Sequence, residues 1–335
     1  MKPTIYTIAA KAGVSIATVS RALNNGPRIS EETRQRILQI ARELGYQPSA
    51  SARSLALNRT EALALILPQI SGPYYSEFIR GAESVTRAHH YHLLIYSSFD
   101  VDQEDALLRF LPTRTDGIIV GTYASQNAYI RRLYDRKFPF LLLGHPAPEG
   151  CTISTVRPDN EAGAYRLTRH LIERHGFRQI AFICGPDYRT HSRERQDGYR
   201  RALLESGLPL LPQYVAEGDF SEASGYAAAQ QLLDLRDAPQ AIFAGNDQMA
   251  IGVLAAINQC GLRVPEDLAV VGFDDIPAAR YLQPSLTTVD LEIFDQGVKA
   301  IDLLLAHICD PAAPVQEIVI PTTLVVRRSC GCTDE

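Results

Sequence analysis

The 335-residue chain contains no tryptophan, two methionines and six cysteines, and it has no long apolar segment. No run of about 18 apolar residues occurs, so we expect no membrane-spanning helix. The first thirty residues lack the apolar core of a secretory signal. The cysteines are scattered, and several stand inside apolar runs, as reduced core cysteines do. We therefore expect a soluble, cytoplasmic protein that does not associate with a membrane.

The sequence patterns of common enzyme and cofactor sites are also missing. The chain has no GxGxxG dinucleotide loop, no GxxxxGK[ST] phosphate loop, no HExxH metal site and no GxSxG nucleophile turn. The histidines of HHYH (89–92) have no evident acidic or cysteine partner. The CGC of residues 330–332 can oxidise or bind metal, but no second pair accompanies it in the sequence. We predict that the protein is not an enzyme and has no cofactor and no metal.

Charge is distributed unevenly along the chain. Residues 1–60 hold nine Lys/Arg and three acids, a charge of +6, while the other 24 bases and 35 acids give −11; the sum is −5. A basic arm on an acidic body suggests a polyanion as the partner of the arm. The alternative is a basic surface that contacts only solvent.

Residues 1–48 read as three short helices. Thr4, Ser15 and Ser30 can cap them by accepting a backbone N–H. Gly13 allows a tight turn between the first two, since glycine tolerates positive φ, and Gly45 stops the third. In the second helix, Val14, Val19 and Leu23 fall on the side that we expect to be buried.

The opposite side of the second helix carries small residues, hydroxyls and one arginine, with no carboxylate. In a helix-turn-helix, here about 7–23, such a helix enters the major groove of DNA. Ile16 and Ala17 can touch thymine methyl groups, and Arg21 can donate to guanine O6 and N7. Hydroxyls can bind phosphates. The candidate DNA contacts in this region are Tyr6, Ser15, Ile16, Ala17, Thr18, Ser20, Arg21 and Asn24. The alternative is a plain helical hairpin.

From residue 62 onward, apolar strand-like runs alternate with helical stretches. The runs cover 62–68, 92–98, 116–122, 139–144, 179–186, 241–247 and 267–275. Such alternation predicts parallel sheets with helices on both faces, and two series of runs predict two lobes. Ligands of such folds bind beyond the carboxyl ends of the strands. Polar and aromatic candidates at these ends are Tyr74, Tyr75, Asn246, Asp247, Asp274 and Asp275.

Several segments together resemble one family. AAKAGVSIATVSRALN followed by RISEETRQRILQIARELGYQPSASARSL is similar to the head and hinge of the lactose-repressor/galactose-repressor (LacI/GalR) family. PYYSEFIRGAE, DGIIV, RERQDGY, GNDQMAIG, VVGFDD and PSLTTV resemble that family's body. The resemblance covers most of the chain, and this order of segments is highly specific, whereas no single segment is.

The resemblance implies an N-terminal all-α helix-turn-helix head and an α/β two-lobed body like the periplasmic binding proteins, with parallel sheets. The head spans 1–48, the hinge 49–60 and the body 61–335. The first lobe takes in about 61–160 plus 292–320, and the second lobe about 161–291 plus 321–335. In the family the hinge forms a helix on DNA, and Ala52, Arg53 and Leu55 are its candidate contacts. Leu55 matches the wedge that opens a base step in the minor groove; without the resemblance we would favour simple packing for it.

The resemblance also adds candidate effector-binding residues. Arg195 matches a family position that binds the ligand. Phe220 matches an aromatic residue that stacks on the ligand. His145 departs from the polar residues that the family commonly shows, and Thr7 replaces a frequent aspartate, which weakens a helix cap. We expect Asp247 and Asp275 to cap helices rather than bind. The predicted effector set is Tyr74, Tyr75, His145, Arg195, Phe220, Asn246 and Asp274.

The function that we expect is a homodimeric repressor of sugar-utilisation genes. A small sugar or sugar derivative would release it from a near-palindromic double-stranded operator. The tail VVRRSCGCTDE has no leucine heptad, which favours dimers over tetramers. The alternatives are a corepressed, purine-type regulator or an activator with the same fold, a sugar-binding transport protein, and a sugar-processing hydrolase.

Overall fold

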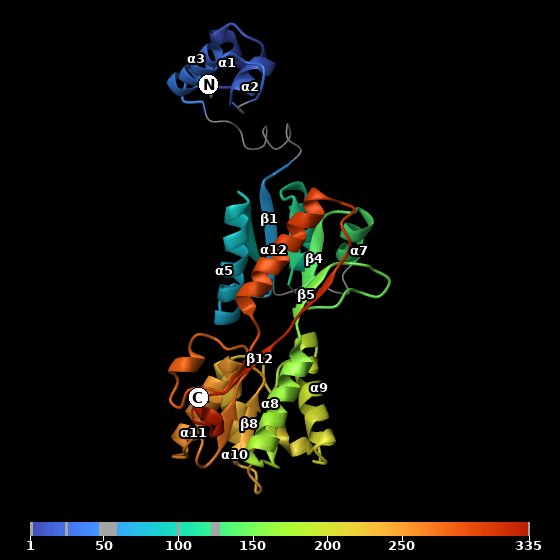
Figure 1. Ribbon diagram of the computed structural model, residues 1–335, viewed down its shortest axis with the longest axis vertical. Helices are drawn as coiled ribbons and strands as arrows, with labels where there is room; N and C mark the ends of the chain where they lie inside the picture. Colours follow the sequence, from blue (N-terminus) through green and yellow to red (C-terminus); the bar gives the residue numbers. More distant parts are fainter. Residues whose placement is uncertain (1–2, 24–25, 47–58, 99–100, 122–127, 334–335) are drawn as a thin grey trace. The chain divides into compact units, whose positions relative to one another are not determined.

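A computed structural model describes residues 3–23, 26–46, 59–98, 101–121 and 128–333. The chain divides into two compact units, residues 1–60 and 61–335, and both are drawn in Figure 1. Among the described residues, no helix combines the length and the apolar character that crossing a bilayer requires.

The first unit contains three helices, as predicted. They are α1 (Ile5–Ala12), α2 (Ile16–Leu23) and α3 (Glu31–Glu43). Thr4, Ser15 and Ser30 each accept the backbone N–H of the residue three positions later, which confirms the three predicted caps. Thr7 does not weaken the first cap, because its Oγ1 accepts the N–H of Thr4 at 3.3 Å and completes a capping box.

A small apolar core holds these helices together. Val19 and Ile37 are fully buried, and Val14, Leu23 and Leu44 pack against them partly buried. Gly13 adopts a left-handed conformation with φ of 67° between α1 and α2, as its position predicted. The buried side of α2 is therefore the predicted one, and its other side is left at the surface.

The first lobe of the second unit is built on a six-stranded parallel sheet with the order β11-β5-β4-β3-β1-β2. Its strands are β1 (Ala62–Leu67), β2 (His92–Ser97), β3 (Gly117–Val120), β4 (Phe140–Leu143), β5 (Thr155–Pro158) and β11 (Glu317–Ile320). Its helices are α5 (Pro73–Ala88), α6 (Val101–Phe110), η1 (Leu111–Thr113), α7 (Ala128–Asp135) and α12 (Ile293–Cys309). Although α12 comes late in the sequence, it lies against α5 in this lobe (Figure 1).

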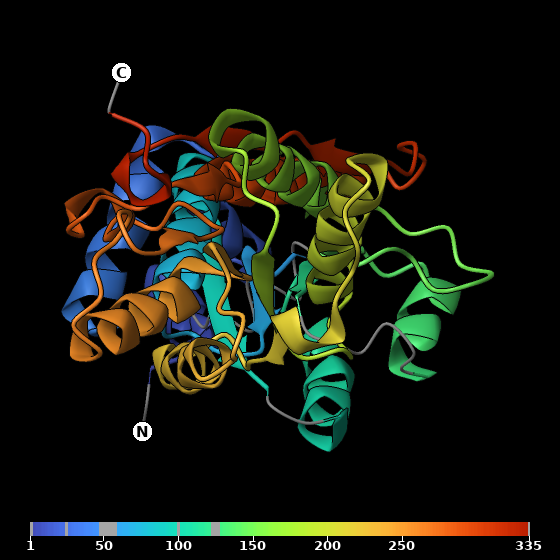
Figure 2. The same ribbon diagram turned by 90° about the horizontal axis from the view of Figure 1, so that it is seen from below.

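The second lobe has a four-stranded parallel sheet with the order β7-β6-β8-β9. Its strands are β6 (Ile180–Cys184), β7 (Val215–Glu217), β8 (Ala241–Ala244) and β9 (Ala269–Val271). Its helices are α8 (Asn160–His175), α9 (Thr190–Glu205), η3 (Pro212–Tyr214), α10 (Glu222–Leu233), α11 (Asp247–Gln259), η4 (Ala279–Tyr281) and η5 (Arg328–Cys330). Figure 2 shows this lobe from its end, with α8 beside α9 and α10 beside α11.

An antiparallel pair, β10 (Thr288–Asp290) and β12 (Thr323–Val325), lies next to β9. The chain passes between the lobes after β5, after β10 and after β11, and these three passages are visible in Figure 1.

All seven predicted strands are present. The sequence did not predict β5, β7, β10, β11 or β12, which have three or four residues each. Their sequences, TVRP, VAE, TVD, EIVI and TLV, each contain a polar residue, so no continuous apolar run marks them.

Candidate functional site

A cavity lies between the two lobes, at the carboxyl ends of their strands. Residues of both lobes line it, and a cleft between two lobes is a common place for a small-molecule site. All seven residues predicted to bind an effector line it: Tyr74, Tyr75, His145, Arg195, Phe220, Asn246 and Asp274. They come from the segments that follow β1, β4, β6, β7, β8 and β9. This agrees with the rule that ligands of parallel α/β sheets bind beyond the carboxyl ends of the strands, which we call the strand-end rule.

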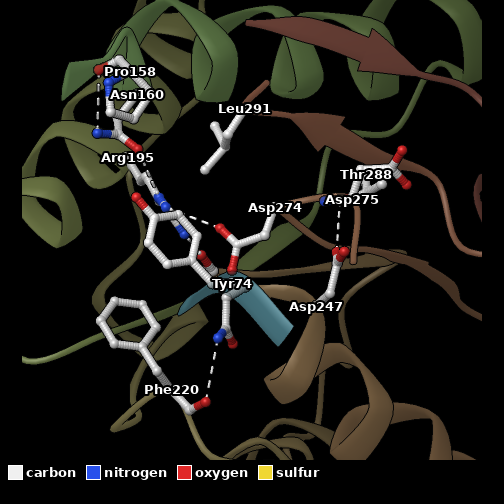
Figure 3. A network of polar contacts seen from close by, with 12 residues as sticks. Tyr74, Pro158, Asn160, Arg195, Phe220, Asp247, Asp274, Asp275, Thr288 and Leu291 are labelled. Carbon is white, nitrogen blue, oxygen red and sulfur yellow. Dashed lines mark hydrogen bonds and ion pairs between the residues drawn. The ribbon is translucent and has the colours of Figure 1, made fainter. Parts of the chain in front are cut away.

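A buried ion pair forms the polar centre of the cavity. Arg195 Nη2 lies 3.1 Å from Asp274 Oδ1, and the two side chains are only 6% and 8% exposed. Figure 3 shows the pair from close by. Burial raises the pKa of Asp274 to about 6, and the charge of Arg195 opposes that rise. Burial therefore outweighs the attraction of the neighbouring cation at this carboxylate.

Further contacts hold the Arg195 guanidinium in a single orientation. Its Nε donates to Asn160 Oδ1 at 3.1 Å, and its Nη1 donates to the Gly245 carbonyl oxygen at 2.6 Å. The guanidinium carbon also lies 4.2 Å from the centre of the Phe273 ring. An arginine has five N–H donors. Three of them are taken by these acceptors and by Asp274, so up to two are left for a bound molecule.

An aromatic surface forms another part of the wall. Phe220 adopts a positive φ of 72°, and its ring stacks with that of His191 at a centroid distance of 5.3 Å. The Arg189 guanidinium carbon lies 5.3 Å from the centre of the same ring. The cavity thus presents a flat apolar face beside a cluster of hydrogen-bonding groups, an arrangement suited to a polar ring with C–H faces.

Two histidines of the cavity wall are kept uncharged. Burial, with the nearby charge of Arg189 as the second cause, lowers the pKa of His145 to about 4. Burial also lowers the pKa of His191 well below its usual value, with Arg195 as the next cause. Near neutral pH both side chains are therefore neutral imidazoles, each of which offers one donor and one acceptor.

The remaining predicted residues are tied into neighbouring elements. The Asn246 side chain caps α11 by accepting the N–H of Met249 at 2.9 Å, and its Nδ2 donates to the Phe220 carbonyl oxygen at 3.2 Å. The Tyr74 hydroxyl donates to Gln296 Oε1 at 3.0 Å. The rings of Tyr74 and Tyr75 meet edge to face at 5.2 Å. These contacts fix the side chains before any ligand arrives.

Asp247 and Asp275 are structural, but the prediction that they cap helices was wrong. Asp247 accepts the Thr288 hydroxyl at 2.6 Å and the Ile276 N–H at 2.9 Å, and so it joins α11 to β10 (Figure 3). Asp275 pairs with Arg327 at 2.7 Å. The cap of α11 is Asn246, because the first residue with extended backbone before the helix takes that role.

Five polar residues of the cavity wall were not predicted from the sequence: Gln69, Asn160, Arg189, His191 and Gln248. Arg189 and His191 follow β6, so the same strand-end rule could have found them. Asn160 begins α8 at a passage between the lobes, and no pattern in the sequence marks it. Its Nδ2 donates to Glu194 Oε2 at 2.8 Å while its oxygen holds Arg195.

The face of α2 predicted to meet DNA lies at the surface of the first unit. Ser15, Ile16, Ala17 and Arg21 are exposed, and Thr18 is half-buried. Ser20 is half-buried as well, and Tyr6 on α1 is exposed. Among the described residues, no hydrogen bond or ion pair engages the Arg21 guanidinium. The candidate contacts that lie outside the described residues are Asn24, Ala52, Arg53 and Leu55.

Two family models match the chain. Residues 4–49 match bacterial regulatory proteins of the lacI family, and residues 168–330 match the periplasmic binding protein-like domain. The HTH-type transcriptional repressor PurR of Erwinia tasmaniensis is 36% identical over 329 residues, which are 97% of this chain and 96% of that protein.

Solved structures match over the same extent. The lac repressor dimer bound to operator and the anti-inducer ONPF has a TM-score of 0.87 and 28% identity, covering 98% of this chain and 99% of that one. A complex of the transcriptional regulator CelR with cellobiose has a TM-score of 0.75 and 31% identity, with the same coverage. The predicted fold, a helix-turn-helix head with a two-lobed parallel α/β body, is confirmed by these matches.

Proposed function

This chain belongs to the lacI family of bacterial regulatory proteins, and from that premise we propose how it recognises its operator and its effector. The protein is a DNA-binding transcriptional repressor regulated by a small molecule. The observation that carries the effector assignment is the buried Arg195–Asp274 pair beside the Phe220 ring, inside a cavity that both lobes line. We propose that it acts as a homodimer on a near-palindromic operator, in the cytoplasm.

The effector that fits the cavity best is a sugar or a sugar derivative. Adjacent ring hydroxyls pair well with groups that make two hydrogen bonds, and the Arg195 guanidinium and the Asp274 carboxylate are such groups. The apolar C–H face of the sugar would lie on the Phe220 ring, and neutral His145 would accept or donate one further bond. The CelR structure, which holds cellobiose, supports this class of ligand.

The head would read DNA with the exposed side of α2. Ile16 and Ala17 would contact thymine methyl groups, and Arg21 would donate to a guanine. Ser15, Thr18 and Ser20 would position the helix on phosphates, together with Tyr6 and Asn24. Leu55, with Ala52 and Arg53 beside it, would act in the minor groove. Two heads of a dimer would meet two half-sites, because a two-fold dimer matches a two-fold operator.

Selection of bound fragments from the sheared genomic DNA of the source organism, at one near-physiological salt concentration, tests this function. A few near-palindromic sites should be enriched by the wild-type protein, and pooled sugars should reduce that enrichment. The Arg195→Ala variant is the matched control, since it should enrich the same sites and ignore the sugars. Failure to enrich any site, with and without pooled sugars and purines, would contradict the operator-binding role.

The same selection distinguishes the two directions of control. If an effector increases enrichment, the protein is a corepressed regulator of the purine type. The stacked pair of His191 and Phe220 supports this second candidate, because the flat face of a purine base can stack on an aromatic surface.

A further inference from the structure

Four metal-binding side chains meet in the second lobe, away from the effector cavity. His170 and His175 come from the last turns of α8, and Cys330 and Cys332 come from the segment after β12. Their ligand atoms all lie within 4.8 Å of one another, with Cys330 buried and the other three half-buried. The sequence showed only the CGC half of this group, because the histidines precede it by about 160 residues.

Three sulfur–nitrogen separations already match those of a tetrahedral zinc site. Cys330 Sγ lies 3.6 Å from His170 Nε2, and Cys332 Sγ lies 3.7 Å from the same nitrogen. Cys332 Sγ lies 3.4 Å from His175 Nε2. With zinc–sulfur bonds of about 2.3 Å and zinc–nitrogen bonds of about 2.0–2.1 Å, tetrahedral geometry puts sulfur and nitrogen about 3.6 Å apart.

The backbone explains how the four side chains converge. The two histidines are separated by four residues at the end of a helix, a spacing found in zinc sites. The two cysteines are separated by Gly331 alone, whose φ of 101° is left-handed. That conformation, which side-chain-bearing residues rarely adopt, turns the chain so that both sulfur atoms reach the same two histidines.

Neighbouring groups hold two of the ligands in place. The Thr287 hydroxyl donates to Cys330 Sγ at 3.2 Å, and outer contacts of this kind orient the ligands of metal sites. The His175 ring stacks on Phe177 at 5.3 Å with an interplanar angle of 16°. Two thiolates would balance the charge of a divalent ion. All six cysteines of the chain are free thiols in the structure.

We propose that His170, His175, Cys330 and Cys332 bind one zinc ion. Two sulfur and two nitrogen ligands in tetrahedral positions select zinc among the common divalent ions. All four positions would be filled by the protein, which is the pattern of a structural site and not of a catalytic one. The ion would fasten the segment after β12 to α8, and so it would stabilise the second lobe.

Metal content of the full-length protein tests this site directly. The protein is purified with a reductant and without chelators, and zinc is measured by elemental mass spectrometry. We expect one zinc per chain in the wild type and at least a tenfold loss in Cys332→Ser and in His175→Gln. The matched controls are Cys260→Ser and His89→Asn, which change an exposed cysteine and an exposed histidine outside the group and should keep the ion.

Cobalt substitution of the wild type gives a readout that does not depend on any variant folding. Cobalt(II) bound here should show the intense visible bands of tetrahedral coordination and a thiolate charge-transfer band, and added zinc should erase both. A chelator should lower the Tm of the wild type but not that of Cys332→Ser. The proposal is overturned if the reduced protein takes up neither ion, if Cys330 and Cys332 form a disulfide in its place, or if all variants retain equal zinc.

Discussion

The proposed effector cavity and the exposed face of α2 hold their polar groups in opposite ways. In the cavity, Arg195 is fixed by Asp274, Asn160 and Gly245 and is almost completely buried. On α2, Arg21 is exposed, and no described residue holds its guanidinium. When one member of a buried pair is removed, its partner is left buried without a counterpart, so the loss of stability is large. An exposed side chain makes its contact with DNA independently of its neighbours, and salt screens that contact.

The largest effect should follow the loss of Arg195. Arg195→Ala leaves Asp274 buried without its cation, which should lower the free energy of unfolding by about 3–5 kcal/mol. It should also abolish the effector response while sparing operator binding by the folded protein. Urea unfolding and calorimetric titration with the effector measure the two effects.

The control for Arg195 lies on the same helix. Arg201 pairs with Glu161, but the two side chains are 44% and 43% exposed, so Arg201→Ala should cost at most about 1 kcal/mol. If the two alanine variants lose equal stability, or if Arg195→Ala and Asp274→Ala both still respond to the effector, our view of the cavity is wrong.

The next largest effect should be on DNA recognition by α2. Arg21→Ala should weaken operator binding by about 1–3 kcal/mol, the value of one good two-bond contact with a base. Arg21→Lys is the matched control: it keeps the charge but lacks the planar fork. Arg21→Lys should therefore bind random DNA as well as the wild type does, but its affinity for the operator should stay as low as that of Arg21→Ala. Fluorescence anisotropy at several salt concentrations measures the affinity for the operator and the affinity for random DNA separately. Unchanged operator affinity in Arg21→Ala would remove Arg21 from the base-reading set.

The sequence predicted these two regions for different reasons. The caps at Thr4, Ser15 and Ser30 and the buried Val19 are local features, so spacing along the chain was enough to find them. The cavity residues stand at strand ends, and parallel sheets bring such ends together whatever their separation in sequence. The family resemblance supplied Arg195 and Phe220, which the strand-end rule did not select.

What the sequence did not predict depends on contacts between distant segments. Nothing near Asp247 in the sequence indicates that Thr288 and Ile276 will use its two oxygens. Asn160 reaches Arg195 only because α8 and α9 pack together. In the same way, His170 gains a cysteine neighbour only through the fold. Pairings of this kind follow from tertiary packing, which a pattern along one segment does not encode.

A smaller effect should appear in the pH dependence of effector binding. The pKa of Asp274 is raised to about 6 by burial, so its carboxylate is ionised above that pH and protonated below it. Binding that uses the carboxylate should be full near pH 7.5 and should fall up to about tenfold per pH unit below about 6. His145, with its pKa lowered to about 4, and His191, lowered well below its usual value, stay neutral in this window. Arg189 and Arg195 remain charged throughout.

Stability should change in the opposite direction over the same range. The native pKa of Asp274 lies above the unfolded value, so the folded state binds the proton more tightly, and this group's contribution to stability improves as pH falls through about 6 toward about 4. Asp274→Asn cannot titrate and should flatten both profiles relative to the wild type. Calorimetric titrations and urea unfolding at matched pH values compare the two proteins, and identical profiles would assign the dependence to another group.

The smallest effect should distinguish a structural hydroxyl from one that also meets DNA. Ser15 and Ser30 cap α2 and α3 through similar bonds, at 3.1 and 3.2 Å. Replacing either with alanine should lower the stability of the head by about 1 kcal/mol, measured by hydrogen exchange of the helix amides in the full-length protein. Ser15→Ala should weaken operator binding further, because its hydroxyl lies at the start of the proposed recognition helix, whereas Ser30→Ala should not. Equal operator affinities in the two variants would mean that Ser15 acts on DNA only by capping α2, and the reading surface would then begin at Ile16.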